Sequence, residues 1–208
     1  MKTAQSKKAY SYLALGDSYT IGEQLPLEEN FPAQLVRMMQ EKGKEFEPPR
    51  ILAATGWTTG ELLAAIRKSR LRKKYDFVTL LIGVNNQYRG LSIADYVLEF
   101  EQLLKIAIGF AGDDAGHVIV LSIPDWAFTP FAKGRDTEQI TATISQYNNA
   151  NRQISDRYQA HYLDITAASR NAATDPSLLA EDGLHYAAKV YTGWAAELSH
   201  YIDPRTEN

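Results

Sequence analysis

Short apolar runs alternate along the chain with longer segments in which apolar residues recur every three or four positions. The runs cover residues 10–15, 51–54, 76–82, 118–122 and 162–165. Runs of this length predict strands that are buried on both faces, as in a parallel sheet. The longer segments predict helices. Regular alternation of the two predicts a three-layer α/β sandwich with right-handed crossovers between parallel strands.

Apolar positions at helical spacing follow each predicted strand. They are Phe31, Leu35, Val36 and Met39; Leu62, Leu63 and Ile66; Ile93, Val97, Phe100, Leu104 and Ile108; Ile140, Ile144, Tyr147, Ile154 and Tyr158; and Val190, Trp194, Leu198 and Ile202. Residues 166–184 show little regularity, and a last helix is predicted over residues 186–202. With no repeat and no second domain visible, we predict one domain over residues 1–208, with loose termini at 1–9 and 203–208.

Composition and charge argue against a nucleic-acid partner. The 208 residues are 45% hydrophobic and carry a net charge of −3, so the chain has no overall basic bias. One cationic cluster, residues 67–74, lies at a predicted helix end and contains no aromatic residue, so we expect no nucleic-acid partner. The oligomeric state stays open.

Residue types and patterns that the sequence lacks argue against disulfides, metal sites and membrane insertion. The chain has no cysteine, which excludes disulfides and a thiolate nucleophile. No pair of histidines has metal-ligand spacing, so neither a metal nor another cofactor is expected. No apolar run approaches the roughly 20 residues that span a bilayer, and the polar start lacks a signal-peptide core. We therefore expect a cytoplasmic protein without stable membrane insertion.

A serine follows the first predicted strand, in the segment Gly16-Asp17-Ser18. Ligands of open parallel sheets bind at the carboxyl ends of the strands, where a nucleophilic serine could act. Considered alone, this segment is more typical of a turn or a helix cap. Ser122 also ends a predicted strand at the same edge and is the alternative nucleophile.

Only one of the four histidines is expected on the same side of the sheet as Ser18. His117 and His161 immediately precede strands and therefore lie at the amino edge, whereas His200 lies late in the last helix. His185 follows the fifth strand and can act as the base that a serine nucleophile needs. Asp182 precedes it by three residues, a spacing that allows the carboxylate to bond the imidazole Nδ1.

Two further strand ends carry groups that could stabilise an oxyanion. Gly56 follows the second strand and offers an unhindered backbone N–H, and Asn85 follows the third strand and offers a side-chain amide. Each residue is also an ordinary turn residue. Together with Ser18, Asp182 and His185, these two residues supply every group that acyl transfer requires. This coincidence favours a catalytic function over a purely structural role for each residue.

The chain resembles the SGNH hydrolases, also called GDSL esterases and lipases, in four segments that occur in the family's order. They are Gly16-Asp17-Ser18; Gly56 within Ala-Thr-Gly-Trp-Thr-Thr; Gly83-Val84-Asn85; and Asp182-Gly-Leu-His185. The resemblance implies a flavodoxin-like five-stranded sheet in the order 2-1-3-4-5. It also implies a Ser18–His185–Asp182 triad and an oxyanion hole formed by the Ser18 N–H, the Gly56 N–H and the Asn85 amide.

Two residues depart from the family pattern. Tyr19 stands where the family name implies leucine, and Asn86 stands where many members have aspartate.

The sequence lacks the signatures of two rival folds. It contains neither the Gly-x-Ser-x-Gly nucleophile elbow of an α/β-hydrolase nor the Gly-x-Gly-x-x-Gly loop of a nucleotide-binding fold after its first strand.

The expected activity is hydrolysis of small carboxylic esters through an acyl-enzyme. Aromatic residues in loops at the carboxyl edge are candidates for the substrate rim: Tyr19, Trp57, Tyr88, Trp126 and Phe128, followed by Phe131. They can equally pack the loops onto the domain. The alternative function is an inactive module that binds a small molecule or carbohydrate on the same fold.

Overall fold

A single five-stranded parallel sheet forms the centre of the molecule in the computed structural model, which describes residues 9–206. The strands are β1 (Tyr12–Gly16), β2 (Arg50–Ala53), β3 (Phe77–Leu81), β4 (Val118–Leu121) and β5 (His161–Leu163). Their order is β2-β1-β3-β4-β5. The parallel sheet and the order implied by the resemblance are therefore both confirmed.

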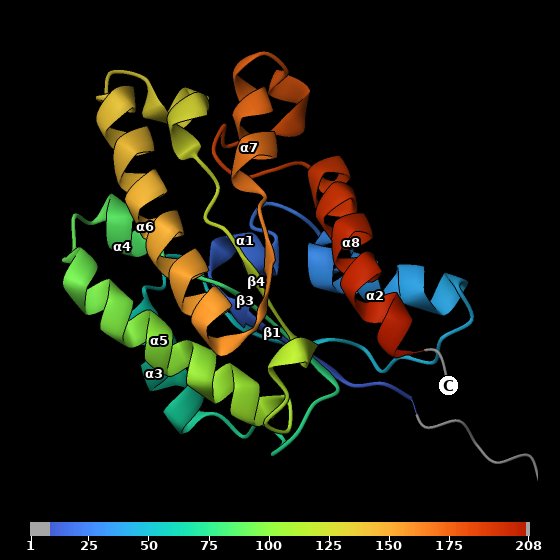
Figure 1. The fold of residues 1–208 in the computed structure, drawn as a ribbon. Coiled ribbons are helices and arrows are strands. Elements are labelled where there is room, and N and C mark those ends of the chain that lie inside the picture. The colour runs from blue at the N-terminus through green and yellow to red at the C-terminus, as the bar shows by residue number, and fades with distance from the viewer. Residues whose placement is uncertain (1–8, 207–208) are drawn as a thin grey trace, which may run out of the picture.

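Helices cover both faces of this sheet. They are α1 (Ser18–Ile21), α2 (Phe31–Glu41), α3 (Thr59–Lys68), α4 (Val84–Tyr88), α5 (Ile93–Phe110), α6 (Thr137–Tyr158), α7 (Thr166–Ser169) and α8 (Ala188–Ile202). Figure 1 shows α2 and α8 on one side of the sheet and α3, α5 and α6 on the other. This is the three-layer sandwich that the alternation of strands and helices predicts.

The register of the central strands aligns the exits that carry the candidate residues. Gly16, the last residue of β1, pairs with Ala53 of β2 and with Leu81 of β3. The next segments, which lead to Ser18, Gly56 and Asn85, therefore start from one row of the sheet. Strands β1 and β3 are entirely buried, whereas the edge strand β2 is largely half-buried.

Close packing at the end of β1 requires glycine. A Cβ at Gly16 would lie 2.0 Å from Thr20 Oγ1 and 2.5 Å from the Leu81 carbonyl oxygen. Both distances are far below van der Waals contact, so no side chain fits there. The glycine lets α1 fold back over the strand end, which places Ser18 directly above the sheet.

Several element boundaries differ from the sequence predictions because short helical turns were not visible in the hydrophobic pattern. The irregular stretch 166–184 contains α7 and two 3₁₀ helices, Arg170–Ala173 and Pro176–Leu178. The last helix begins at Ala188 instead of residue 186, and Asn85, which the sequence marks as a possible turn residue, lies in α4.

The chain after α8 also differs in part from the expected loose terminus. Asp203–Arg205 form a 3₁₀ helix, and Thr206 is buried. Arg205 contributes to this order by donating a hydrogen bond to the Tyr201 carbonyl at 2.7 Å. Residues 1–8 and 207–208 of the predicted loose termini lie outside the described residues.

Candidate active site

Ser18 lies at the carboxyl edge of the sheet as the first residue of α1. Asp17 caps this helix, because its Oδ1 accepts a hydrogen bond from the Tyr19 N–H at 3.0 Å. The cap defines the direction in which the chain leaves β1. Ser18 is 5% exposed, so its hydroxyl lies in a largely water-excluded position.

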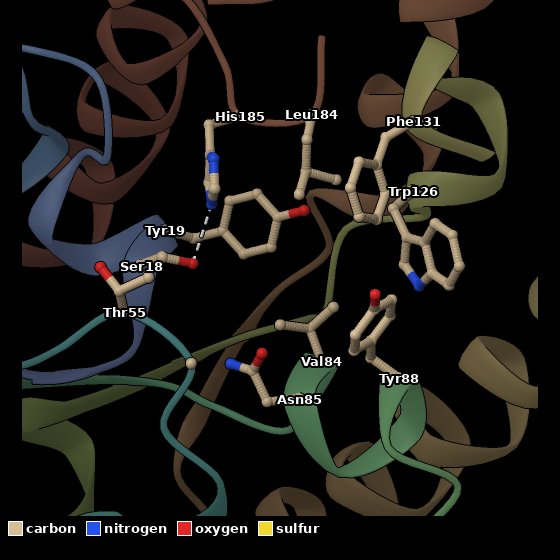
Figure 2. A pocket seen from close by; sticks show the side chains of 11 residues that line it. Ser18, Tyr19, Thr55, Val84, Asn85, Tyr88, Trp126, Phe131, Leu184 and His185 are labelled. Atoms are coloured by element: carbon tan, nitrogen blue, oxygen red, sulfur yellow. Dashed lines mark hydrogen bonds between the residues drawn. The ribbon is translucent and has the colours of Figure 1, made fainter. Parts of the chain in front are cut away.

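His185 reaches Ser18 from the loop before α8. Its Nε2 lies 3.0 Å from Ser18 Oγ, and Figure 2 marks this contact with a dashed line. The backbone of His185 is anchored, because its carbonyl accepts a hydrogen bond from the Ala180 N–H at 2.8 Å. The ring of Tyr19 packs against the imidazole with 5.4 Å between ring centroids. The aromatic residue that replaces the family's leucine thus supports the histidine.

Asp182 holds the opposite side of the imidazole. Its Oδ2 lies 2.5 Å from His185 Nδ1, and its Oδ1 accepts hydrogen bonds from the backbone N–H groups of Leu184 and His185 at 3.0 and 2.9 Å. Partial burial raises the pKa of this carboxyl, but the hydrogen bonds from the ring and the backbone outweigh burial and leave the pKa below its usual range. An ionised Asp182 favours the tautomer that carries its proton on Nδ1, and in that tautomer Nε2 is a hydrogen-bond acceptor.

The other histidines lie where the sequence places them, away from Ser18. His117 Nδ1 bonds the carbonyl of Asp76, which precedes β3. His161 begins β5 and bonds Arg205, and His200 is an exposed residue late in α8. Of the four, only His185 meets the serine.

The predicted oxyanion donors border the same cavity as Ser18. Gly56 lines it, in a turn that has φ +79° at this glycine. Neither the Gly56 N–H nor the Ser18 N–H has a hydrogen-bond acceptor within residues 9–206. Asn85 donates one amide hydrogen to the Trp57 carbonyl at 2.9 Å, which leaves its second amide hydrogen for a ligand. Figure 2 shows the Asn85 side chain extending towards the Ser18 side of the cavity.

Asn86, the second departure from the family pattern, has a structural partner. It is 2% exposed, and its Oδ1 accepts a hydrogen bond from the Thr59 N–H at 3.0 Å. Its Nδ2 donates to Thr59 Oγ1 at 2.7 Å. An asparagine can make both bonds without burying a charge. Asn86 thereby joins α4 to the start of α3.

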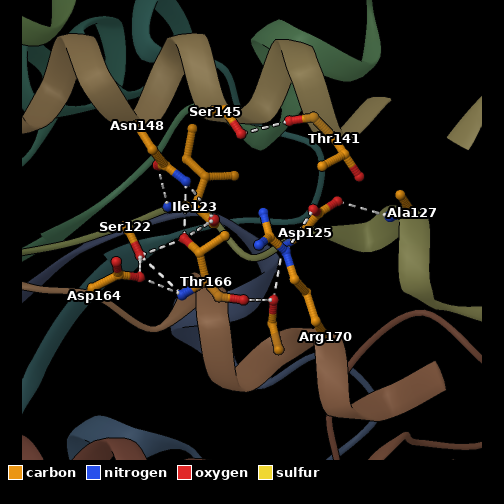
Figure 3. A network of polar contacts seen from close by, with 11 residues as sticks. Ser122, Ile123, Asp125, Ala127, Thr141, Ser145, Asn148, Asp164, Thr166 and Arg170 are labelled. Carbon is orange, nitrogen blue, oxygen red and sulfur yellow. Dashed lines mark hydrogen bonds and ion pairs between the residues drawn. The ribbon is translucent and has the colours of Figure 1, made fainter. Parts of the chain in front are cut away.

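Ser122, the alternative nucleophile, belongs to a buried polar network and not to the cavity (Figure 3). Its Oγ accepts hydrogen bonds from the N–H groups of Ile165 and Thr166 at 2.9 and 3.1 Å, and it lies 2.7 Å from Thr166 Oγ1, whose single hydrogen also has the Ile123 carbonyl as an acceptor. With its lone pairs occupied and Asp164 as its acceptor, this hydroxyl connects β4 to the start of α7. The network gives Ser122 a structural role.

A buried acid lies beneath the serine, at a position that the sequence marks only as part of a turn or helix cap. Asp17 is 0% exposed, and its Oδ2 has no hydrogen-bond partner within residues 9–206. Burial raises the pKa of this carboxyl to about 7, against a smaller lowering effect of the Tyr19 N–H. Asp17 therefore caps α1 with a carboxyl that ionises near neutral pH.

The cavity beside Ser18 has a volume of about 160 Å³ and mostly apolar walls. Its lining residues are Ser18, Tyr19, Thr55, Gly56, Val84, Asn85, Tyr88, Trp126, Phe131, Leu184 and His185. Tyr19, Tyr88, Trp126 and Phe131 are thus brought together there (Figure 2). Trp57 and Phe128 are not, because Trp57 packs against the core and Phe128 borders a separate hollow.

Arg135 stabilises the aromatic wall of the cavity from outside. Its guanidinium lies 5.2 Å from the ring centre of Tyr88, 5.4 Å from that of Trp126 and 5.3 Å from that of Phe131. It also donates a hydrogen bond to the Tyr88 hydroxyl at 3.2 Å. One cation therefore contacts a ring at the end of α4 and two rings in the short helical turns after β4, an arrangement that sequence spacing alone could not reveal.

The described part of the chain offers neither a metal-binding cluster nor a helix able to span a membrane. Residues 9–206 contain no cluster of three or more histidine, aspartate or glutamate side chains suited to a metal ion. None of the helices formed by these residues is both long and apolar enough to span a bilayer.

Solved structures similar to this one include several esterases. A substituted form of Axe2, an acetyl xylan esterase from Geobacillus stearothermophilus, has a TM-score of 0.70 at 19% identity and covers 93% of this chain and 94% of its own. The lipase/acylhydrolase from Enterococcus faecalis has a TM-score of 0.70 at 21% identity, covering 95% and 97%. Esterase EstA from Pseudoalteromonas sp. has a TM-score of 0.67 at 18% identity, covering 96% and 100%. At these identities the likeness concerns the fold.

Comparison of the sequence itself identifies the family. No curated protein matches the chain. The model of the GDSL-like lipase/acylhydrolase family matches residues 14–192, a span that includes all four segments on which the resemblance was based. The chain therefore belongs to the GDSL-like lipase/acylhydrolase family.

Proposed function

We propose that this protein is a serine esterase that hydrolyses small carboxylic esters with short acyl groups. The observation that carries the proposal is the continuous pair of contacts from Ser18 Oγ to His185 Nε2, 3.0 Å, and from His185 Nδ1 to Asp182 Oδ2, 2.5 Å. These contacts border a cavity that also contains Gly56 and Asn85.

Acylation begins when His185 Nε2 accepts the proton of Ser18 Oγ and the oxygen attacks the ester carbonyl carbon. The carbonyl oxygen becomes an oxyanion, which the N–H groups of Ser18 and Gly56 and the second amide hydrogen of Asn85 stabilise. The tetrahedral intermediate collapses as the imidazolium protonates the leaving alkoxide. An acyl group remains on Ser18.

Deacylation repeats the sequence with water. His185 removes a proton from a water molecule, which attacks the acyl carbonyl, and the oxyanion occupies the same donors. The C–O bond to Ser18 then breaks, and the serine recovers its proton from His185. Asp182 stays ionised throughout and stabilises the imidazolium, in keeping with its lowered pKa.

Cavity size supports a small substrate. A space of about 160 Å³ with aromatic and aliphatic walls accommodates a few carbon atoms beside the scissile carbonyl. The similar structures include acetyl xylan esterases, which supports an acetyl or another short acyl group as the transferred unit. The partner that follows from this site is a small-molecule ester.

The experiment that tests the proposal is hydrolysis of p-nitrophenyl acetate by the wild type and by Ser18→Ala. Wild-type turnover should depend on Ser18, because the proposed reaction passes through an acyl group on its Oγ. Turnover that is equal in both proteins would refute the proposal and would favour the inactive binding module.

A further inference from the structure

Arg89 connects the two segments that carry the proposed oxyanion donors. It follows α4 directly, and its backbone N–H caps this helix by bonding the Asn85 carbonyl at 3.1 Å. Its side chain extends to the other segment, where Nη2 donates a hydrogen bond to the Gly56 carbonyl. One residue thus contacts the main chain of both Asn85 and Gly56.

A second contact of the guanidinium extends the connection to α3. Arg89 Nη1 lies 3.4 Å from a carboxylate oxygen of Glu61. That same carboxylate caps α3, because Glu61 Oε2 accepts hydrogen bonds from the Thr58 N–H at 2.8 Å and from Thr58 Oγ1 at 3.0 Å. Hydrogen bonds from Thr58 lower the pKa of Glu61 most, and the nearby charge of Arg89 lowers it further, so this pKa lies below its usual range. The carboxylate therefore stays charged at neutral pH.

The Gly56 turn needs such a connection because of its place in the sheet. It leaves β2, an edge strand that pairs only with β1, whereas Asn85 leaves β3 on the far side of β1. Sheet pairing therefore does not join the two donors directly. The sheet aligns the two strand ends through β1, and contacts beyond these ends complete the placement of the Gly56 N–H and the Asn85 amide.

We propose that Arg89 is a positioning residue that holds the Gly56 turn against α4 and thereby sets the spacing of the oxyanion hole. The inference rests on the proposed function, since it assumes that Gly56 and Asn85 stabilise an oxyanion. Arg89 does not line the cavity, so it acts through Gly56 and not on the substrate. Arg89 therefore affects the stability of the transition state, in which the oxyanion forms.

Arg89 acts together with other contacts between the same segments. The Asn85 amide bonds the Trp57 carbonyl at 2.9 Å, and buried Asn86 bonds Thr59. These contacts keep the turn near α4 when the arginine is removed, so the fold should survive. Loss of Arg89 should then loosen the hole and cost on the order of tenfold in kcat, less than the 10²–10³-fold cost of removing a donor outright.

The test compares Arg89→Ala, Arg89→Lys and a control, Arg72→Ala, in steady-state hydrolysis of p-nitrophenyl acetate. Arg72 is a matched control because it also pairs with a glutamate, Glu47 at 2.7 Å, and its side chain is 59% exposed. We expect Arg89→Ala to lower kcat with little change in KM or Tm. Lysine should restore part of kcat, because its ammonium can still donate to the Gly56 carbonyl. Arg72→Ala should match the wild type.

A tetrahedral inhibitor provides a second measurement. An aryl trifluoromethyl ketone forms an oxyanion on Ser18, so its affinity should fall in Arg89→Ala by the same factor as kcat. Wild-type kcat and inhibitor affinity in Arg89→Ala would overturn the inference. Equal losses in the alanine and lysine variants, accompanied by a lowered Tm, would also overturn it, because they would indicate a general structural role.

Failure of the proposed function gives a different result. If Ser18→Ala and Asn85→Ala both retain wild-type turnover, the oxyanion hole itself is wrongly assigned, and Arg89 cannot position it. If both lose turnover and Arg89→Ala does not, the esterase proposal stands and only the role of Arg89 is refuted. The two failures are therefore distinguishable within one set of variants.

Discussion

His185 Nε2 and Ser18 Oγ lie 3.0 Å apart, although 167 positions of the chain separate the two residues. The parallel sheet explains the contact, because β1 and β5 both deliver the chain to the same edge. Neither residue type is informative in isolation. Their distance makes the arrangement a candidate for proton transfer from the hydroxyl to the imidazole.

The first prediction separates the two serines that end strands. Ser18→Ala should fold normally and lose all labelling by a fluorophosphonate probe, because the nucleophile is absent. Ser122→Ala should still be labelled, but it should lose about 1–3 kcal/mol of stability because the buried Ile165 N–H loses its acceptor, whereas the Thr166 N–H keeps its bond to Asp164 Oδ1. Labelling and a denaturant titration measure the two effects. Retained labelling of Ser18→Ala would exclude Ser18 as the nucleophile.

The second prediction concerns the residue that orients the base. Asp182→Asn removes the charge that stabilises the imidazolium and allows the tautomer in which Nδ1 accepts a hydrogen bond. We expect kcat for p-nitrophenyl acetate to fall by about 10²–10⁴-fold with little change in KM. A variant with wild-type kcat would show that the aspartate only shapes the loop.

The third prediction follows from the buried carboxyl of Asp17. Its pKa is about 7 in the folded protein and 3.8 in a model compound, so the unfolded chain releases the proton first as pH rises. Between these two pKa values the folded state holds a proton that the unfolded chain has already released. The free energy of unfolding therefore falls with increasing pH up to about pH 7. Asp17→Asn retains a capping oxygen but does not titrate.

Urea unfolding at pH 5 and pH 8 checks this prediction. The free energy of unfolding of the wild type, relative to that of Asp17→Asn, should fall by about 2–3 kcal/mol between these pH values. The comparison with the variant removes the contributions of the other titrating groups. A constant difference across this range would mean that Asp17 is already ionised in the folded protein at pH 5.

The fourth prediction concerns acyl-chain selectivity. Phe131 forms part of the aromatic wall and is 38% exposed, so Phe131→Ala should lengthen the cavity without exposing the core. We expect the ratio of kcat/KM for p-nitrophenyl hexanoate to that for the acetate to rise about tenfold, which corresponds to burying roughly two more methylenes at about 0.8 kcal/mol each. Phe128→Ala is the control, because Phe128 borders the separate hollow. An equal shift in both variants would argue against a specific wall.

The positions of the strand exits were predictable because they depend on periodicity and topology. Ser18, Gly56 and Asn85 follow strands that a hydrophobic pattern identifies, and a parallel sheet places all three at one edge. The histidines could be sorted for the same reason. Their placement relative to strand starts and ends assigns each one to an edge of the sheet.

Residues that act through tertiary contacts could not be found in this way. Arg89 and Arg135 look like ordinary surface cations in the sequence, and only the distances to Gly56 and to three aromatic rings distinguish them. Trp57 and Phe128 were plausible rim residues by loop position. Their side chains lie elsewhere because the direction of a loop side chain depends on packing and not on spacing.

The acyl-enzyme tests the central claim most directly. Wild-type protein mixed with p-nitrophenyl acetate should be quenched in acid during turnover, digested and analysed by mass spectrometry. The account predicts one acetyl group on the peptide that contains Ser18, and none on that peptide in His185→Ala quenched under the same conditions. Turnover without an acetylated Ser18, in a wild-type sample quenched throughout the time course, would contradict it.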